Sequence, residues 1–234
     1  MICNSLASIQ ERIANAARRS NRSPDEIKLV AVSKRFSKEK IAEALGCGQF
    51  IFGENYIQES FEKIPYILHK WSDCNISWHF IGKLQSNKAR KAAELFDVIE
   101  TVDSIKLAKN LEKYLAVFDK TLTAYLQINI GREEQKSGIP PDECENFLRQ
   151  LSGLQHLQIK GLMAMPPYFA DPEKTRPFFI EMRKLAEHLV SSKLIGHKGP
   201  VELSMGMSDD FEVAIEEGAT VVRLGTALFG PRQT

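Results

Sequence analysis

The segment KLVAVSK, residues 28–34, decides the fold, because it is a short valine-rich run that a helical pattern follows. A continuous apolar run of this length is typical of a strand buried on both faces, as in parallel sheets. Ser37 is placed as the N-cap of the next segment, in which Ile41 and Leu45 have helical spacing. A strand followed by a helix is the unit from which α/β folds are built.

The same unit repeats along the chain, and one extra helix precedes the first strand. The predicted strands are residues 28–34, 49–55, 77–82, 97–103, 123–130, 158–166, 201–206 and 220–230. Helical patterns separate them, with a break expected near Pro65 in the helix over residues 56–70. Such alternation requires parallel strands with right-handed crossovers, in a doubly wound sheet or a closed barrel. Eight units, with no GxGxxG after the first strand, favour a single (β/α)8 TIM barrel domain over residues 1–234.

The composition excludes several classes of protein. Lys and Arg total 31 against 30 Asp and Glu, and a net charge of +1 gives no electrostatic basis for binding nucleic acid or an anionic membrane. No apolar run approaches the ~20 residues of a membrane span, and the N-terminus lacks a secretory signal, so a cytoplasmic protein is expected. The four cysteines are scattered without a CxxC pair, which predicts free thiols at Cys3, Cys47, Cys74 and Cys144. The histidines lack metal-ligand spacing, so no metal site is expected.

The barrel prediction directs attention to the C-terminal ends of the strands, where such barrels carry their chemistry. Lys34 ends a buried strand, where lost hydration is expected to lower its pKa and leave a neutral amine that forms Schiff bases with aldehydes. The alternative is a lysine that only extends into solvent. The other strand-end candidates are Glu54, Asn55, His79, Asp103, Asn129, Met165, Ser204, Ser208, Arg223 and Gly225. They contain no matched pair of acids, which argues against a glycosidase.

The last two strand ends are candidates for phosphate binding. Gly206 and Gly225 would let the backbone approach an anion closely, and Ser204, Ser208 and Thr226 offer hydroxyl donors. A phosphate site after strands seven and eight recurs in barrels of this kind. The alternative is a glycine turn followed by a helix N-cap at Ser208.

Two titratable residues lie within apolar strands. Arg223 needs a partner when it is buried, and the alternative to a ligand role is an ion pair with an acid on a neighbouring strand. His79, within WHFIG, is expected to be a core histidine rather than a catalytic base.

Six segments together resemble the pyridoxal phosphate homeostasis protein family, which is similar to the N-terminal domain of alanine racemase. They are LVAVSK, FGENYIQE, WHFIGKLQSNK, GLMAMPP, LSMGMSDDFEVAIEEGAT and VRLGTALFG, and the resemblance covers residues 27–230. It implies a monomeric barrel that holds pyridoxal 5′-phosphate (PLP) as a Schiff base on Lys34, with Arg223 facing the pyridine nitrogen. The residues that it assigns to the cofactor are Lys34, Asn55, Ser204, Met205, Gly206, Ser208, Arg223, Gly225 and Thr226. Lys136 also matches a lysine of the family, without a role that we can give it.

The resemblance leaves a choice between a catalyst and a carrier. Arg223 at the ring nitrogen can only donate a hydrogen bond, so the ring would stay unprotonated and withdraw electrons weakly. Alanine racemase, as the resemblance has it, adds a domain with a second base, whereas this sequence ends soon after Gly230. We therefore expect a PLP carrier in vitamin B6 homeostasis that has no catalytic residues, with apo forms of PLP-dependent enzymes as candidate partners. The alternative is a low-activity PLP-dependent amino-acid racemase or a Schiff-base lyase.

Overall fold

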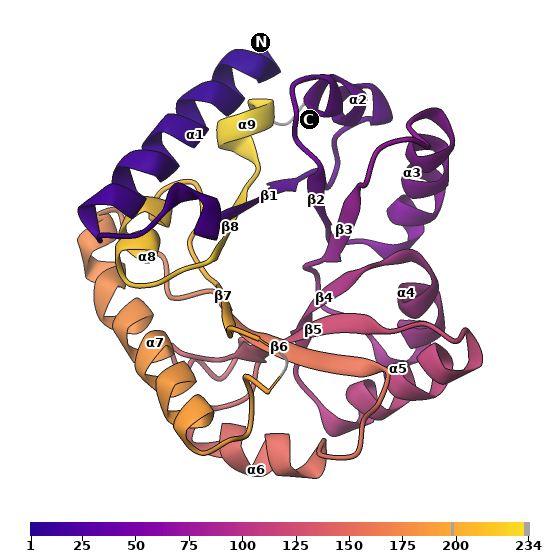
Figure 1. Cartoon of the computed structure of the whole chain (residues 1–234), viewed down its shortest axis with the longest axis vertical. Coiled ribbons are helices and arrows are strands. Elements are labelled where there is room, and N and C mark those ends of the chain that lie inside the picture. Colours follow the sequence, from indigo (N-terminus) through magenta and orange to yellow (C-terminus); the bar gives the residue numbers. More distant parts are fainter. Residues whose placement is uncertain (198, 232–234) are drawn as a thin grey trace.

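The structure, a computed structural model, describes residues 1–197 and 199–231. Its strands form one closed barrel in which each strand is parallel to the next and β8 pairs with β1 (Figure 1). The strands are β1 (Lys28–Val32), β2 (Ile51–Glu54), β3 (Ser77–Phe80), β4 (Val98–Val102), β5 (Leu122–Ile128), β6 (Leu157–Ala164), β7 (Glu202–Ser204) and β8 (Val221–Leu224). The predicted eight-stranded parallel barrel is confirmed.

Helices surround the barrel on its outer side (Figure 1). They are α1 (Ile2–Arg19), α2 (Lys38–Gly46), α3 (Ile57–Lys70), α4 (Ala89–Leu95), α5 (Ile105–Val117), α6 (Cys144–Gln150), α7 (Arg176–Ser191), α8 (Phe211–Glu216) and α9 (Thr226–Phe229). Short 3-10 helices are η1 (Pro24–Glu26), η2 (Ser86–Lys88), η3 (Pro141–Glu143) and η4 (Pro172–Thr175). The extra N-terminal helix is α1, whose apolar face packs against α8 and α9.

The expected break at Pro65 does not occur, because α3 continues through this residue. A proline inside a helix removes one backbone donor and crowds the preceding turn. The opposite face of α3 buries Ile57, Ile64 and Ile67. This packing outweighs the local penalty, as tertiary contacts often do.

Alternation along the strands separates side chains inside the barrel from side chains that face the helices. In β1, Leu29 and Ala31 belong to the large outer core, whereas Val30 belongs to a smaller inner cluster. That inner cluster consists of Val30, Val98, Tyr125, Met163 and Val221. Because successive side chains of a strand point to opposite faces, the same alternation places His79 and Arg223 inside the barrel.

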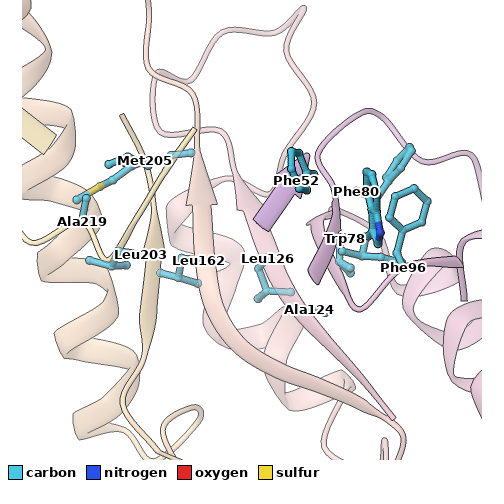
Figure 2. Close-up of a cluster of buried hydrophobic side chains, with 14 of the residues drawn as sticks. Phe52, Trp78, Phe80, Phe96, Ala124, Leu126, Leu162, Leu203, Met205 and Ala219 are labelled. Carbon is cyan, nitrogen blue, oxygen red and sulfur yellow. The ribbon is translucent and has the colours of Figure 1, made fainter. Parts of the chain in front are cut away.

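The outer core joins the strands to the helices with large aromatic side chains (Figure 2). Phe52 of β2 and Trp78 of β3 have ring centroids 5.3 Å apart. Phe80 of β3 meets Phe96, which follows α4, edge to face at 5.2 Å. Each of these rings is at most 1% exposed, so their burial contributes a large hydrophobic stabilisation.

The prediction that all four cysteines are free thiols is wrong. Cys3 in α1 and Cys47, which follows α2, form a disulfide with 5.1 Å between their Cα atoms. The two residues are 44 positions apart, and the packing of α1 against α2 brings them together, which spacing in the sequence could not show. Cys74 and Cys144 are free.

Every helix within residues 1–197 and 199–231 is too short or too polar to cross a lipid bilayer.

Candidate functional site

The residues expected to bind a cofactor gather at one end of the barrel. Lys34 lies in the turn after β1, and Asn55 follows β2, while residues 205–208 follow β7 and residues 225–226 follow β8. In the closed barrel, β7, β8, β1 and β2 are consecutive neighbours. Residues from opposite ends of the sequence therefore meet at the carboxyl ends of four adjacent strands. We call this end of the barrel the mouth, and barrels of this kind carry their chemistry there.

Lys34 is half-buried where β1 opens into the mouth. The preceding residue, Ser33, is fully buried and extends the pairing with β2, since its backbone N–H donates to the Gly53 carbonyl oxygen at 3.0 Å. The following residue, Arg35, has φ of +62°, a left-handed conformation that is uncommon for a side chain of this size. The turn that contains Lys34 is therefore bounded by the strand pairing of Ser33 on one side and by the left-handed backbone of Arg35 on the other.

The loop after β7 is held close to β8 and α8. The Met205 N–H donates to the Val221 carbonyl at 3.1 Å, and the Arg223 N–H donates to the Gly206 carbonyl at 3.1 Å. Gly206 has φ of +94°, and a Cβ added there would lie 2.6 Å from the Cβ of Ala214 in α8. Only glycine fits this position, so the loop backbone packs directly against α8.

Ser208 does not cap the helix that follows it. α8 begins at Phe211 with Asp210 as its N-cap, and the Asp210 carboxylate accepts a hydrogen bond from the Met207 N–H at 2.7 Å. Burial raises the pKa of Asp210. Ser208 instead lies within the glycine loop, half-buried, so the alternative of a simple N-cap at Ser208 is wrong.

The loop after β8 is short and leads directly into α9. Gly225 is the N-cap of α9, and its carbonyl accepts hydrogen bonds from the N–H groups of Leu228 and Phe229 at 3.0 and 2.9 Å. A Cβ added at Gly225 would lie 3.4 Å from Val32, the last residue of β1. The end of β8 is thus packed against the end of β1, next to the turn that holds Lys34.

A buried polar network lies beneath the mouth, inside the barrel. The Arg223 Nη1 donates to Ser204 Oγ at 2.6 Å, and Ser204 Oγ donates to Glu100 Oε2 at 2.6 Å. Glu100 Oε1 and His79 Nδ1 are 2.6 Å apart, and Arg223 Nη2 donates to the Ala164 carbonyl at 2.9 Å. Each of the four polar side chains is at most 5% exposed. We call His79, Glu100, Ser204 and Arg223 the inner network.

Charges within the inner network compensate one another. Burial would raise the pKa of Glu100, but hydrogen bonds and charges from His79, Arg223 and Ser204 lower it overall. Burial lowers the pKa of Arg223, and the negative charges of Glu100 and Asp210 oppose that shift. The carboxylate and the guanidinium, with Glu100 Oε2 3.7 Å from Arg223 Nη1, therefore support each other's charged forms.

The inner network differs from the expectation for the partner of Arg223 and agrees with the expectation for His79. The acid that pairs with Arg223 is not on a neighbouring strand, because Glu100 belongs to β4, on the far side of the barrel from β8. Side chains from opposite strands meet inside a narrow barrel, which a search of adjacent strands misses. His79 is buried and partnered, as expected of a core histidine. The Ser204 hydroxyl, expected to face a phosphate, already makes two hydrogen bonds within this network.

A cavity of about 400 Å³ opens at the mouth. Its polar lining residues are Asn55, Lys83, Thr101, Gln127, Asn129, Lys136, Ser137 and Tyr168. The Asn55 Oδ1 is buried and has no hydrogen-bond partner among the residues that the structure describes. Lys136 donates to the Pro166 carbonyl at 3.3 Å and pairs with Glu133 at 2.5 Å. The cavity therefore presents one unsatisfied acceptor and amide and ammonium donors to a small polar ligand.

Two larger hollows lie elsewhere on the barrel. One, of about 600 Å³, is lined by Leu157 and Ile159 at the start of β6, and the other, of about 520 Å³, by Lys28 and Leu29 at the start of β1. Both lie at the amino ends of the strands. Since barrel chemistry occurs at the carboxyl ends, the mouth is the better candidate site.

Comparison with known sequences finds the same family over nearly the whole chain. Residues 5–233 match the family model described as alanine racemase, N-terminal domain. A pyridoxal phosphate homeostasis protein from Pasteurella multocida is 42% identical over 97% of this chain and 96% of its own length. A protein of the same name from Escherichia coli is 41% identical over 99% of this chain and 97% of its own length.

Solved structures agree with these relatives. PipY of Synechococcus elongatus, solved with PLP bound, is 38% identical, with a TM-score of 0.83 over 98% of this chain and all of its own. Alanine racemase from Corynebacterium glutamicum is 18% identical, with a TM-score of 0.71 over 98% of this chain and 62% of its own. The second likeness concerns the fold alone.

Proposed function

This chain belongs to the pyridoxal phosphate homeostasis protein family, within the alanine racemase N-terminal domain proteins, and we propose on that premise that it binds PLP at the mouth of its barrel. The observation that supports this most is the meeting of Lys34 with the glycine loops after β7 and β8 on adjacent strands. PLP requires an amine for its aldehyde and backbone or hydroxyl donors for its phosphate.

The residues at the mouth fit this group. Lys34 would hold PLP covalently, and Gly206, Ser208, Gly225 and Thr226 would surround its phosphate. The unpartnered Oδ1 of Asn55 needs a donor, because buried acceptors are normally satisfied, so Asn55 could bind a ligand held at the mouth. When bound, PLP supplies a reactive aldehyde and an electron-withdrawing ring.

We further propose that the protein stores and releases PLP in vitamin B6 homeostasis and does not turn over amino acids. Arg223 would face the ring nitrogen, and a guanidinium can only donate. Its two Nη atoms already donate to Ser204 Oγ and to the Ala164 carbonyl, and Glu100 Oε2 lies 3.7 Å from Nη1. A fixed cation at this position keeps the ring nitrogen unprotonated, which weakens the electron withdrawal on which PLP catalysis depends.

Borohydride reduction of the PLP-loaded protein, followed by peptide mapping, tests the site. The adduct is expected on Lys34, and the Lys34→Ala variant should lose both the yellow colour and the adduct. A labelled peptide elsewhere, or a Lys34→Ala protein that keeps the adduct, contradicts the assignment.

Racemase and transaminase assays over a broad panel of amino acids test the proposed role. Turnover above about 1 s⁻¹, in the range of ordinary enzymes, would identify a catalyst and overturn the carrier proposal. We propose that the monomeric protein passes PLP to apo forms of PLP-dependent enzymes. Transfer that continues in the presence of a trap for free PLP supports direct delivery, and transfer abolished by the trap means simple release.

A further inference from the structure

A buried lysine on α3 contacts the turn that carries Lys34. Lys63 is only 9% exposed, although it lies on a surface helix. Its Nζ donates to the Ser33 carbonyl at 2.9 Å and to Glu54 Oε1 at 3.2 Å, and it also pairs with Glu59 Oε1. A buried ammonium is tolerated where acceptors replace its hydration, and Lys63 has three of them.

The two carboxylates that hold Lys63 also hold the residues on both sides of Lys34. The Ser33 hydroxyl donates to Glu54 Oε1 at 2.7 Å. The Arg35 backbone N–H donates to Glu59 Oε1 at 2.7 Å. Side chains of β2 and α3 thus hold the residue before Lys34 and the residue after it. We call Ser33, Glu54, Glu59 and Lys63 the turn clamp.

Lys63 is the cation on which the turn clamp depends. Glu54 is fully buried on the face of β2 that Phe52 also occupies, which is the face toward the helices. Burial raises the pKa of Glu54, and the ammonium of Lys63 and the Ser33 hydroxyl oppose this shift. Without Lys63, two carboxylates would lie close together around one turn with no positive charge between them. Their repulsion and the left-handed φ of Arg35 would both favour a different turn.

We propose that Lys63 is a positioning residue for Lys34, and that it fixes, through Ser33 and Glu59, the turn that directs the Lys34 amine into the mouth. The inference rests on the proposed function, because it takes Lys34 as the amine that holds PLP. Lys63 does not itself attack the aldehyde, since its ammonium is occupied by three acceptors. A displaced amine reacts more slowly, and misplacement of a reacting group by about 1 Å costs up to about 100-fold in rate.

The test compares Lys63→Met with the wild type and with Lys70→Met, a control at the exposed end of the same helix. Three quantities are measured: the rate at which visible absorbance appears on mixing with PLP, the visible circular dichroism of the bound PLP, and hydrogen exchange of the Arg35 amide without PLP. Lys63→Met should slow PLP attachment by about 10- to 100-fold, alter the dichroism and speed the exchange. Lys70→Met should match the wild type in all three.

A folded Lys63→Met protein with the attachment rate and dichroism of the wild type overturns the proposal. If Lys63→Met does not fold, Glu59→Gln decides, because glutamine keeps the shape but weakens the contact with both Lys63 and the Arg35 N–H. Attachment slowed by about 3- to 10-fold with faster exchange at Arg35 supports the proposal, and unchanged values of both overturn it.

Failure of the proposed function gives a different result. A wild type that takes up no PLP, or a Lys34→Ala variant that takes up as much, contradicts the site itself. Exchange at the Arg35 amide does not involve PLP. Faster exchange in Lys63→Met would then still support the fixing of the turn by Lys63, and unchanged exchange would overturn it.

Discussion

Replacing Glu100 by glutamine should destabilise the protein strongly, although the two side chains have almost the same shape. Glu100 is fully buried and is the acid of the inner network. Its Oε1 is 2.6 Å from His79 Nδ1, and its Oε2 accepts from Ser204 and lies 3.7 Å from Arg223 Nη1. Glu100→Gln keeps an acceptor but removes the charge that compensates a buried guanidinium.

The expected loss is about 3–5 kcal/mol in the free energy of unfolding, the usual result of removing one partner from a buried ion pair. The geometry is consistent with this value. Two unit charges 3.7 Å apart attract each other by about 4 kcal/mol at an effective dielectric constant of about 20. The glutamine NH2 group must also replace one carboxylate oxygen, so a donor faces either His79 or Ser204 where the carboxylate only accepted.

Urea unfolding of four proteins measures this effect: the wild type, Glu100→Gln, Arg223→Met and the double variant. If the two charges compensate each other, the double variant should be about 2 kcal/mol more stable than the sum of the single losses predicts. Single losses that add to within about 0.5 kcal/mol would refute the reasoning, because independent sites behave in this way.

The same proteins show a pH dependence with a defined sign. The pKa of Glu100 is lowered in the folded state, so its contribution to stability is full above the ordinary carboxyl pKa and is lost as the pH falls through the lowered value. The difference between the wild type and Glu100→Gln should therefore narrow in acid. A difference that grows in acid would contradict the assigned charge state.

Three further outcomes are expected. Gly206→Ala should lower the free energy of unfolding in urea by about 2–3 kcal/mol, because the added Cβ would lie 2.6 Å from a side chain of α8. The control Gly48→Ala has a similar positive φ but open space around the new Cβ, and it should lower the free energy of unfolding by about 1 kcal/mol. Iodoacetamide should modify Cys74 before Cys144 in the native protein, because burial raises the pKa of the Cys144 thiol to about 12, and mass spectrometry of timed samples shows the order. Burial would raise the pKa of Glu112, but hydrogen bonds from three backbone N–H groups near the start of β6 lower it overall. The difference in free energy of unfolding between the wild type and Glu112→Gln, measured in urea, should therefore narrow as the pH falls and Glu112 is protonated.

The barrel could be predicted, and a candidate site proposed at its mouth, because both depend on local patterns. Short valine-rich runs separated by helical periodicity are sufficient to indicate a parallel barrel, and the barrel then places every strand end at one mouth. Lys34 and Gly225 lie far apart in the sequence, yet this topology alone brings their loops to adjacent strands.

Contacts across the barrel and beneath the helices could not be predicted in the same way. Glu100 lies in the apolar strand VIETV, just as Arg223 lies in an apolar strand, so a charged residue among apolar ones marks both. That they pair with each other depends on which side chains meet inside the barrel. Lys63 lies one residue before Ile64 and four before Ile67, on the apolar face of α3, where a charge indicates a buried partner. The Cys3–Cys47 disulfide depends on how α1 packs against α2, which no local pattern encodes.

The inner network lies inside the barrel and the turn clamp lies on the helix side of β1 and β2, and each combines a buried cation with a buried carboxylate. The inner network holds Arg223 from inside the barrel, and the turn clamp holds the turn of Lys34 from the helix side. Buried charges of this kind add little net stability compared with apolar packing, but they fix geometry because each group is costly to leave unpaired. Lys34 and Arg223, the proposed contacts of PLP, would therefore both be positioned by charged groups of the core. Substitutions in either set should therefore change the retention of PLP along with stability, whereas substitutions in the exposed helix surface should change neither.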